Sequence, residues 1–271
     1  MLMLSLHQNK KISTPVITTL LVGLLSTFAF GITPAERGLE IAIEVDKRDN
    51  GYNDSTSTLE MILGNKYGES TTRKMRTKTL EQIDDGDKSQ ITFDNPRDVK
   101  GTSFLSFTHK VGSDDQWLYL PGLKRVKRIS SSNKSGPFMG SEFAFEDISS
   151  QEVEKYTYKY LKEEQLNGKD TYVLERDPVD PKSGYTKQIV WIDKERYIAL
   201  KIDFYDRKSS LLKTLTIQDY KQYLDKFWRA DKWEMVNHQT GKTTILNYSK
   251  WNFGTGLKEK HFTKNSLKRS R

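Results

Sequence analysis

The side chains that most often perform catalysis are sparse and widely separated in this sequence. The four histidines include His7 near the N-terminus, and the other three, His109, His238 and His261, are not spaced as ligands of a metal site. The chain contains no cysteine, which excludes thiol nucleophiles and thiolate metal sites. It also lacks a Gly-x-Ser-x-Gly elbow and a glycine-rich phosphate loop. The sequence therefore predicts no enzyme, no metal and no cofactor.

Clustered carboxylates are the remaining candidates for chemistry. Residues 84–87 read Asp-Asp-Gly-Asp and are similar to a fragment of a calcium loop, but the alternating ligands and the distal glutamate of such a loop are missing. We therefore expect a solvated hairpin tip. Asp177 and Asp180 stand beside prolines and predict turn and surface positions rather than a hydrolytic pair.

Residues 114–129 are the most distinctive stretch, because an aromatic run and a basic run flank a Pro-Gly turn. The pattern predicts a hairpin with Trp117 and Tyr119 on one face of its first strand, and Leu118 and Leu120 on the other. Two interpretations of the basic strand stay open: solvated cations, or cations that bind a phosphate or acidic partner at the rim of a cavity. The candidates for binding an anionic partner are Lys124, Arg125, Lys127 and Arg128.

The segment Ser130–Ser150 departs from the strand pattern, because its serines, glycines and proline are interspersed with large apolar side chains. One interpretation is a connection whose aromatic side chains enter the core, with a short helix over Glu142–Ile148. The other is a mobile lid on an apolar cavity. The candidates for cavity or lid are Trp117, Tyr119, Leu120, Phe138, Met139, Phe143 and Phe145.

Period-two patterning dominates the sequence from Ser55 onward. Leu59, Met61 and Leu63 alternate with polar residues, and Asn167-Gly168 separates two alternating runs as the turn of a tight hairpin. The sequence predicts a mainly β (α+β) fold with about eleven antiparallel strands in a meander. Because a long flat sheet would leave exposed edges, we expect one strongly curved sheet that forms an incomplete barrel.

One amphipathic helix is expected before the strands. Thr33 offers an N-cap hydroxyl, Pro34 suits the first helical position, and Glu36 is placed for a capping box. The polar run that ends at Gly51 predicts the end of the helix. This helix should cover part of the sheet.

The first residues have the pattern of a signal peptide. Lys10 and Lys11 precede an uncharged apolar stretch, Ile12–Phe30, and small residues precede a cleavage point after Ala29. An uncleaved anchor is the alternative. We expect a signal peptide over residues 1–29, a single domain over 30–271 and a periplasmic location, and the absence of cysteine excludes a lipoprotein anchor.

The chain is basic, with a formal net charge of +8. Such an excess favours anionic surfaces such as lipid headgroups. The basic residues are interspersed with 36 acidic ones, and an exported protein rarely meets DNA, so we expect no nucleic acid partner. The basic tail Lys258–Arg271 is predicted to be a solvated terminus, with contact to an anionic membrane as the alternative.

Several motifs together resemble the LolA-like outer-membrane lipoprotein-sorting proteins, in the uncharacterised, exporter-associated branch of that superfamily. They cover most of the chain beyond the signal peptide. Besides the hairpin of residues 114–129, they are Phe138-Met139-Gly140-Ser141-Glu142-Phe143, Glu146-Asp147, Gly168, Tyr172, Leu174-Glu175, Tyr185, Lys187 and Trp191-Ile192-Asp193.

The resemblance implies an incomplete antiparallel barrel whose concave face encloses an apolar cavity for acyl chains. It implies a periplasmic carrier or chaperone that shields a lipid or lipoprotein on its way towards the outer membrane. The alternative is a non-enzymatic interaction or regulatory module that senses envelope lipoproteins or docks on an inner-membrane exporter of the RND/MMPL type. No arginine of this chain aligns with a cargo-controlling arginine, so no binding residue is transferred.

Overall fold

A thirteen-stranded antiparallel sheet organises the described part of the chain, residues 31–269 of a computed structural model. The signal peptide predicted for residues 1–29 lies outside the described residues. The helices and strands are α1 (Pro34–Asp49), β1 (Asp54–Gly64), β2 (Ser70–Leu80), β3 (Lys88–Asn95), β4 (Ser103–Phe107), β5 (Asp115–Leu120), β6 (Arg125–Ile129), β7 (Tyr156–Leu166), β8 (Lys169–Pro178), β9 (Tyr185–Asp193), β10 (Ala199–Asp206), β11 (Leu211–Tyr223), β12 (Phe227–Asn237), β13 (Thr243–Phe253) and α2 (Lys264–Arg269).

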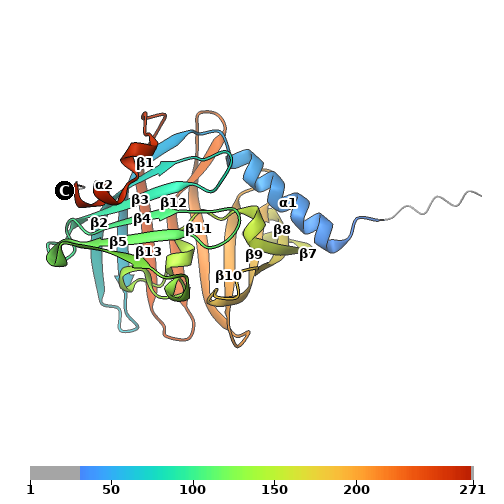
Figure 1. Cartoon of the computed structure of the whole chain (residues 1–271). Coiled ribbons are helices and arrows are strands. Elements are labelled where there is room, and N and C mark those ends of the chain that lie inside the picture. The colour runs from blue at the N-terminus through green and yellow to red at the C-terminus, as the bar shows by residue number, and fades with distance from the viewer. Residues whose placement is uncertain (1–30, 270–271) are drawn as a thin grey trace, which may run out of the picture. The chain divides into compact units, whose positions relative to one another are not determined.

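The order of strands in the sheet follows the chain with one exception. The order is β6-β5-β4-β3-β2-β1-β13-β12-β11-β10-β9-β8-β7. Every pairing therefore joins strands that are neighbours in sequence, except the pairing of β1 with β13. The sheet curves strongly, as expected (Figure 1). Our estimate of about eleven strands was too low, because each alternating run forms its own strand, including the five-residue β4 and β6. The two free edges are β6 and β7.

Helix α1 begins and ends where the sequence predicts. The Thr33 hydroxyl accepts a hydrogen bond from the Glu36 amide at 3.2 Å, and the Glu36 carboxylate accepts one from the Thr33 amide at 2.8 Å, which completes the capping box. Ile41 and Ala42 face the core. Gly38 allows close contact with β7, because a Cβ atom there would lie 2.8 Å from the Tyr160 nitrogen.

Strand alternation divides the apolar side chains between two faces. On β4, Phe104 faces the main core, which also takes up Ile41 of α1, whereas Leu105 faces a second cluster on the opposite face. Phe262 and Leu267, from the C-terminal segment (residues 254–269), are buried in that second cluster.

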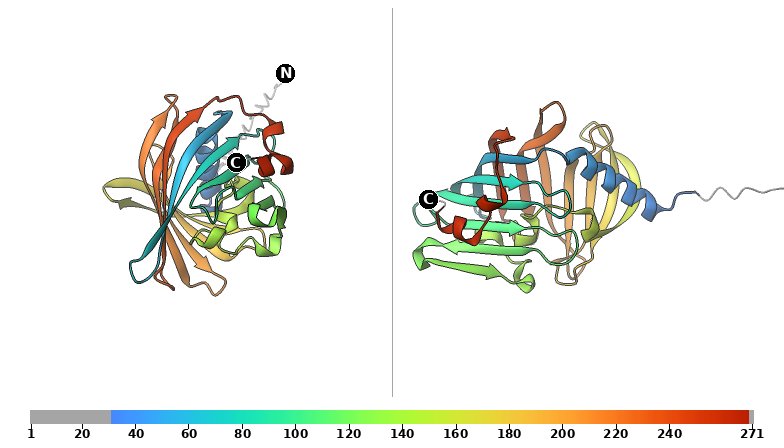
Figure 2. Two further views of the ribbon diagram at one scale, coloured as in Figure 1. Left: turned by 90° about the vertical axis from the view of Figure 1, so that its left-hand side faces the viewer. Right: turned by 45° about the horizontal axis from the view of Figure 1, so that its top comes forward.

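The C-terminal segment is therefore not the solvated tail that we expected. Its helix α2 packs on β4 and β5, outside the curved sheet (Figure 2). The expectation was wrong because the two apolar residues that anchor the segment are isolated among charged ones. No helix in residues 31–269 is both long and apolar enough to cross a bilayer.

Candidate functional site

The segment between the two sheet edges is the irregular part of the fold. Residues 130–155 run from β6 to β7 through short 3-10 turns, and the helix expected over Glu142–Ile148 is reduced to the turn Phe145–Asp147. A longer helix does not form because the Glu146 amide, which a helix would direct to the Glu142 carbonyl, donates to the Lys134 carbonyl instead. The Asp147 and Ile148 amides bond only three residues back, to the carbonyls of Ala144 and Phe145. We call residues 130–150 the connecting segment.

Aromatic side chains of the connecting segment enter the interior of the sheet. Phe138 and Phe143 are fully buried in the main core. The Phe138 ring lies 5.2 Å from Phe104 of β4 and 5.5 Å from Phe145, and Phe143 lies 6.4 Å from Trp233 of β12. The structure thus places these side chains in the core, as in the first of our two interpretations of this segment.

A buried ion pair fixes the connecting segment to β11. The Lys213 ammonium lies 2.7 Å from Asp147, and these side chains are only 4% and 7% exposed. Lys213 also donates to the Glu142 carbonyl at 2.8 Å, and the Tyr185 hydroxyl contacts both Asp147 oxygens at 2.9 Å. Burial, together with the neighbouring Asp147 charge, raises the pKa of Tyr185 well above its ordinary value, so this phenol remains a donor.

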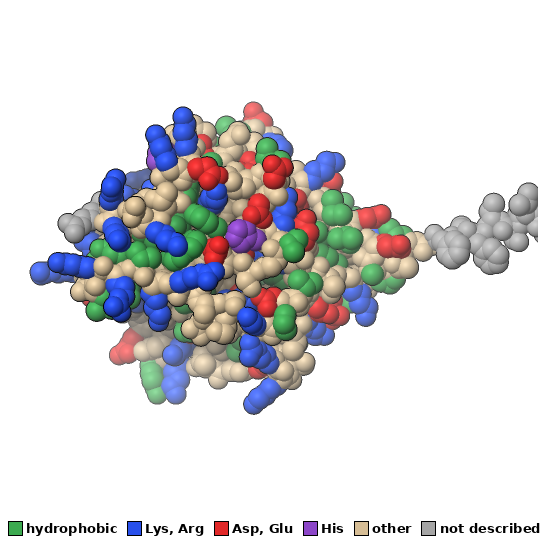
Figure 3. All heavy atoms as spheres, in the orientation of Figure 1, with side chains coloured by type: hydrophobic (Ala, Val, Ile, Leu, Met, Phe, Trp, Pro, Cys, Tyr) green, Lys and Arg blue, Asp and Glu red, His purple; other side chains and the backbone are tan. Residues whose placement is uncertain are grey.

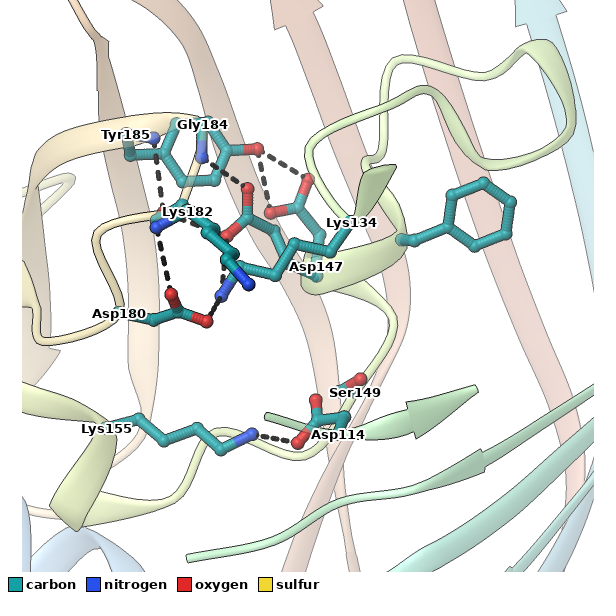
Figure 4. A network of polar contacts seen from close by, with 12 residues as sticks. Asp114, Lys134, Asp147, Ser149, Lys155, Asp180, Lys182, Gly184 and Tyr185 are labelled. Atoms are coloured by element: carbon teal, nitrogen blue, oxygen red, sulfur yellow. Dashed lines mark hydrogen bonds and ion pairs between the residues drawn. The ribbon is translucent and has the colours of Figure 1, made fainter. Parts of the chain in front are cut away.

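A second set of contacts joins the connecting segment to the turn between β8 and β9 (Figure 4). The Glu146 carboxylate accepts hydrogen bonds from the Gly184 amide and the Ser183 hydroxyl, both at 2.8 Å. Lys134 pairs with Asp180 at 2.7 Å. The Glu146 side chain is only 13% exposed, and the loss of hydration raises the pKa of this carboxylate.

Contacts to β2 and β12 complete the attachment. The Arg73 guanidinium, which points inward from β2, donates to the Met139 carbonyl. Asn237 donates to the Glu142 carboxylate at 2.6 Å. The connecting segment is therefore held by apolar contacts in the interior and by polar contacts along its length.

A pocket of about 120 Å³, lined mostly by polar residues, marks the seam between the two edges. Ile129 of β6 and Tyr156 of β7 both line it. Lys155, directly before β7, forms an ion pair with Asp114 beside β5 (Figure 4). Electrostatic contacts, rather than backbone pairing, thus bridge this side of the barrel.

The predicted cavity or lid residues fall into two groups. Leu120, Met139 and Phe145 pack against the main core beside the buried Phe138 and Phe143. Trp117 and Tyr119 lie on the opposite face of β5, in the second cluster under the C-terminal segment. This division confirms the alternation expected for the hairpin.

The four predicted anion-binding residues are also divided by the pleat of β6. Lys127 lies opposite Leu118, on the inner face, whereas Arg128 lies opposite Trp117, on the outer face. Arg128 forms an ion pair with Asp115. Lys124 and Arg125 are exposed at the tip of the hairpin.

The acidic turn 84–87 is more buried than we expected. Asp87 accepts a hydrogen bond from the Tyr52 hydroxyl at 2.6 Å, and burial raises the pKa of Asp87 to about 6. Glu152, from the end of the connection to β7, is only 8% exposed, and burial together with the charge of Asp87 raises its pKa to about 7. His109 lies 2.6 Å from Asp85; burial raises the pKa of that carboxyl, but hydrogen bonds led by the one from His109 lower it to about 2.

Within residues 31–269, no three His, Cys, Asp or Glu side chains are arranged to hold a metal ion. The arrangement of the interior instead suits the burial of apolar groups behind a segment that is not part of the sheet.

Sequence reasoning missed two cations that face inward. Lys213 lies in phase with the buried Leu215 and Ile217, and Arg73 lies in phase with the buried Met75. A basic residue in the apolar phase of a strand is the signal that could have identified them, because such a charge needs a partner inside.

Comparisons with known proteins agree with this fold. A family model described only as an uncharacterised protein matches residues 85–269, and no curated protein matches the chain. A Vibrio parahaemolyticus domain named for outer-membrane lipoprotein sorting has 62% sequence identity and a TM-score of 0.85, over 87% of this chain and 100% of that one.

Two further solved structures extend the comparison. A DUF1329 family protein from Desulfovibrio piger has 31% identity and a TM-score of 0.82, over 87% of this chain and 99% of its own. A LolA superfamily protein from Nitrosomonas europaea shares the fold at 20% identity and a TM-score of 0.69, over 84% of this chain and 98% of its own. The chain belongs to the family shared by this outer-membrane lipoprotein-sorting domain and the DUF1329 protein.

Proposed function

We propose that the protein is a non-enzymatic periplasmic carrier that shields an acyl chain of a lipid or lipoprotein, with the connecting segment as a displaceable cover. The observation that carries this proposal is the burial of Phe138 and Phe143 in the interior by a segment outside the sheet. The relation to a domain named for lipoprotein sorting supports the same class of cargo.

The energetics of such an exchange are favourable. Hiding a sixteen-carbon chain from water is worth roughly 12 kcal/mol, at about 0.8 kcal/mol per methylene. Exposing a buried phenylalanine costs about 1.5–3 kcal/mol. An acyl chain that replaces the two buried phenylalanines therefore more than offsets their exposure, while the remaining difference stays small enough for release when the cover returns.

The polar contacts of the connecting segment allow it to move away from the sheet as one unit. The Arg73 contact to the Met139 carbonyl and the Lys213–Asp147 pair hold the segment at separate points, and water can replace each partner once the segment lifts. The ion pair between Lys155 and Asp114, at the seam between β6 and β7, would break at the same time. In this proposal the hydrogen bond from Arg73 holds the connecting segment against the interior of the sheet.

Native mass spectrometry of protein purified without detergent from the periplasm of a Gram-negative host tests the proposal. We expect bound lipid or acylated protein near one equivalent, identified by denaturing lipid extraction. The variant Arg73→Leu should exchange a fluorescent fatty acid faster than wild type, whereas Arg76→Leu, which removes an outward arginine of the same strand, should not.

A protein free of lipid that also fails to take up the fluorescent fatty acid would refute the carrier. In that case a module that docks on an exporter or senses envelope lipoproteins becomes the better hypothesis. A stable complex with a membrane protein while the interior stays empty would then be the expected observation.

A further inference from the structure

The net positive charge of the chain is concentrated on one surface. Three segments far apart in sequence form it: residues 74–78 of β2, the hairpin 121–129 and the C-terminal segment 254–269. Together they hold twelve of the 44 lysines and arginines but only one of the 36 acidic residues. In Figure 3, lysine and arginine side chains gather over the end of the sheet that carries β2–β5 and the C-terminal segment. We call these twelve cations the basic surface, of which Arg125 and Lys127 lie opposite inward-facing leucines on the edge strand β6.

The fold brings these segments together in two ways. The β6-β5-β4-β3-β2 order places the hairpin and β2 in one half of the sheet, and α2 packs across β4 and β5 between them. On β2, Lys74, Arg76 and Lys78 alternate with the inward Met75, so they share the outer face with α2. Burial, and after it the neighbouring Arg76, lower the pKa of Lys78.

Few of these cations are neutralised by ion pairs. Arg76 pairs with Asp94 and Arg128 with Asp115. The other ten have no ion pair to another residue within 31–269, and Lys264 lies instead over the Trp117 ring at 4.7 Å. A stable fold does not require so many unpaired like charges in one place, and they repel one another.

Apolar groups stand among the cations. Leu123 is 70% exposed at the tip of the hairpin, flanked by Lys124 and Arg125. Trp117 and Tyr119 underlie the C-terminal segment. Trp117 and Tyr119 are buried there, so the exposed apolar group is Leu123. Cations around an exposed leucine match the headgroup layer of an anionic bilayer, which attracts charge and accepts apolar groups.

We propose that the basic surface docks the protein on bilayers that contain anionic phospholipids. This docking is argued from the outer face and does not depend on a cargo in the interior. Lipid attraction is worth about 1 kcal/mol for each lysine or arginine near the surface, so a few of the ten unpaired cations are enough for reversible binding. The attraction falls off within a Debye length, so binding weakens as salt rises.

Vesicle flotation tests the docking with delipidated wild-type protein. We expect at least about 100-fold stronger partitioning onto vesicles of phosphatidylcholine with 30 mol% phosphatidylglycerol than onto phosphatidylcholine alone, lost at about 0.5 M salt. The triple variant Lys74→Gln/Arg76→Gln/Lys78→Gln, on the outer face of β2, should lower the partition coefficient about 100-fold. The triple variant Lys258→Gln/Lys260→Gln/Lys268→Gln should do the same, because both segments belong to one surface.

A matched control removes three exposed lysines from turns at other places, as Lys66→Gln/Lys208→Gln/Lys242→Gln, with the same change in net charge. We expect it to bind within about threefold of wild type. Equal binding to both kinds of vesicle, or an equal loss in all three variants, would overturn the proposal. Binding to heparin without binding to anionic vesicles would also overturn it and would indicate an acidic polymer as the partner.

Discussion

The buried pair Lys213–Asp147 provides a quantitative test of how the connecting segment is held. The variant Lys213→Met removes an ammonium that is 4% exposed and that contacts Asp147 at 2.7 Å and the Glu142 carbonyl at 2.8 Å. The carboxylate then stays buried without its counter-ion. Breaking a buried pair in this way costs about 3–5 kcal/mol, so we expect the free energy of unfolding to fall by that amount.

The double variant Lys213→Met/Asp147→Asn separates loss of the pair from loss of packing. It removes both charges, so it should be less destabilised than the sum of the single variants, by about 2 kcal/mol or more. Urea denaturation measures these differences, and hydrogen exchange shows where they act. We expect amides of residues 134–147 to exchange faster in Lys213→Met, because the contact to the connecting segment is lost.

An exposed pair provides the control. Lys162 is 58% exposed in its pair with Glu164, so Lys162→Met should cost less than about 1 kcal/mol. A cost for Lys213→Met as small as that of the control, with unchanged exchange of the connecting segment, would show that this segment does not depend on the buried pair.

Three further predictions concern other parts of the fold. The variant Gly38→Ala should lower the melting temperature although alanine favours helices, because its Cβ would lie 2.8 Å from the Tyr160 nitrogen; calorimetry measures this. The pKa of Glu152 is raised to about 7 in the folded state, whereas its ordinary value is 4.5. Between these two pH values the folded state holds a proton that the unfolded state has released. This group therefore favours folding below pH 4.5, and that contribution to stability is lost as pH rises through 7. Glu152→Gln should therefore be more stable than wild type at pH 8 by about 3 kcal/mol and equal to it near pH 4.5, as urea titrations at both pH values would show. Leu267→Ala, which opens a gap beside Trp117, should cost about 2–3 kcal/mol and increase quenching of tryptophan fluorescence by acrylamide; unchanged quenching would contradict the packing of the C-terminal segment.

Local patterns in the sequence were sufficient to predict helix α1 and the strands of the sheet. The capping box at Thr33 and Glu36 located α1, because both hydrogen bonds form within four residues. The Asn167-Gly168 turn located the hairpin of β7 and β8, because both residues adopt positive φ there, at 51° and 76°. Signals of this kind depend only on neighbours in the chain.

The candidate site could not be predicted in the same way, because it is formed by contacts between residues that are far apart in the sequence. Lys213 and Asp147 are 66 positions apart, and Arg73 reaches Met139 across the same distance. The C-terminal segment escaped prediction for the same reason, since Phe262 and Leu267 need Leu105 of β4 as their partner. Burial of isolated apolar or charged residues follows from tertiary packing rather than from local periodicity.

The pairing of β1 with β13 has a consequence for the way the chain folds. Every other pairing among the described strands joins neighbours in sequence, so β1–β6 and β7–β13 are two meanders that can each form from local contacts. The β1–β13 ladder then joins them and closes a loop of residues 64–243. Once both meanders have formed, the chain still free between them is the connection of residues 130–155, and closing it costs on the order of 3 kcal/mol of chain entropy, required once rather than at every strand. Folding speed should therefore depend on this single ladder, and substitutions in β1 should slow folding more than equally destabilising ones in β8.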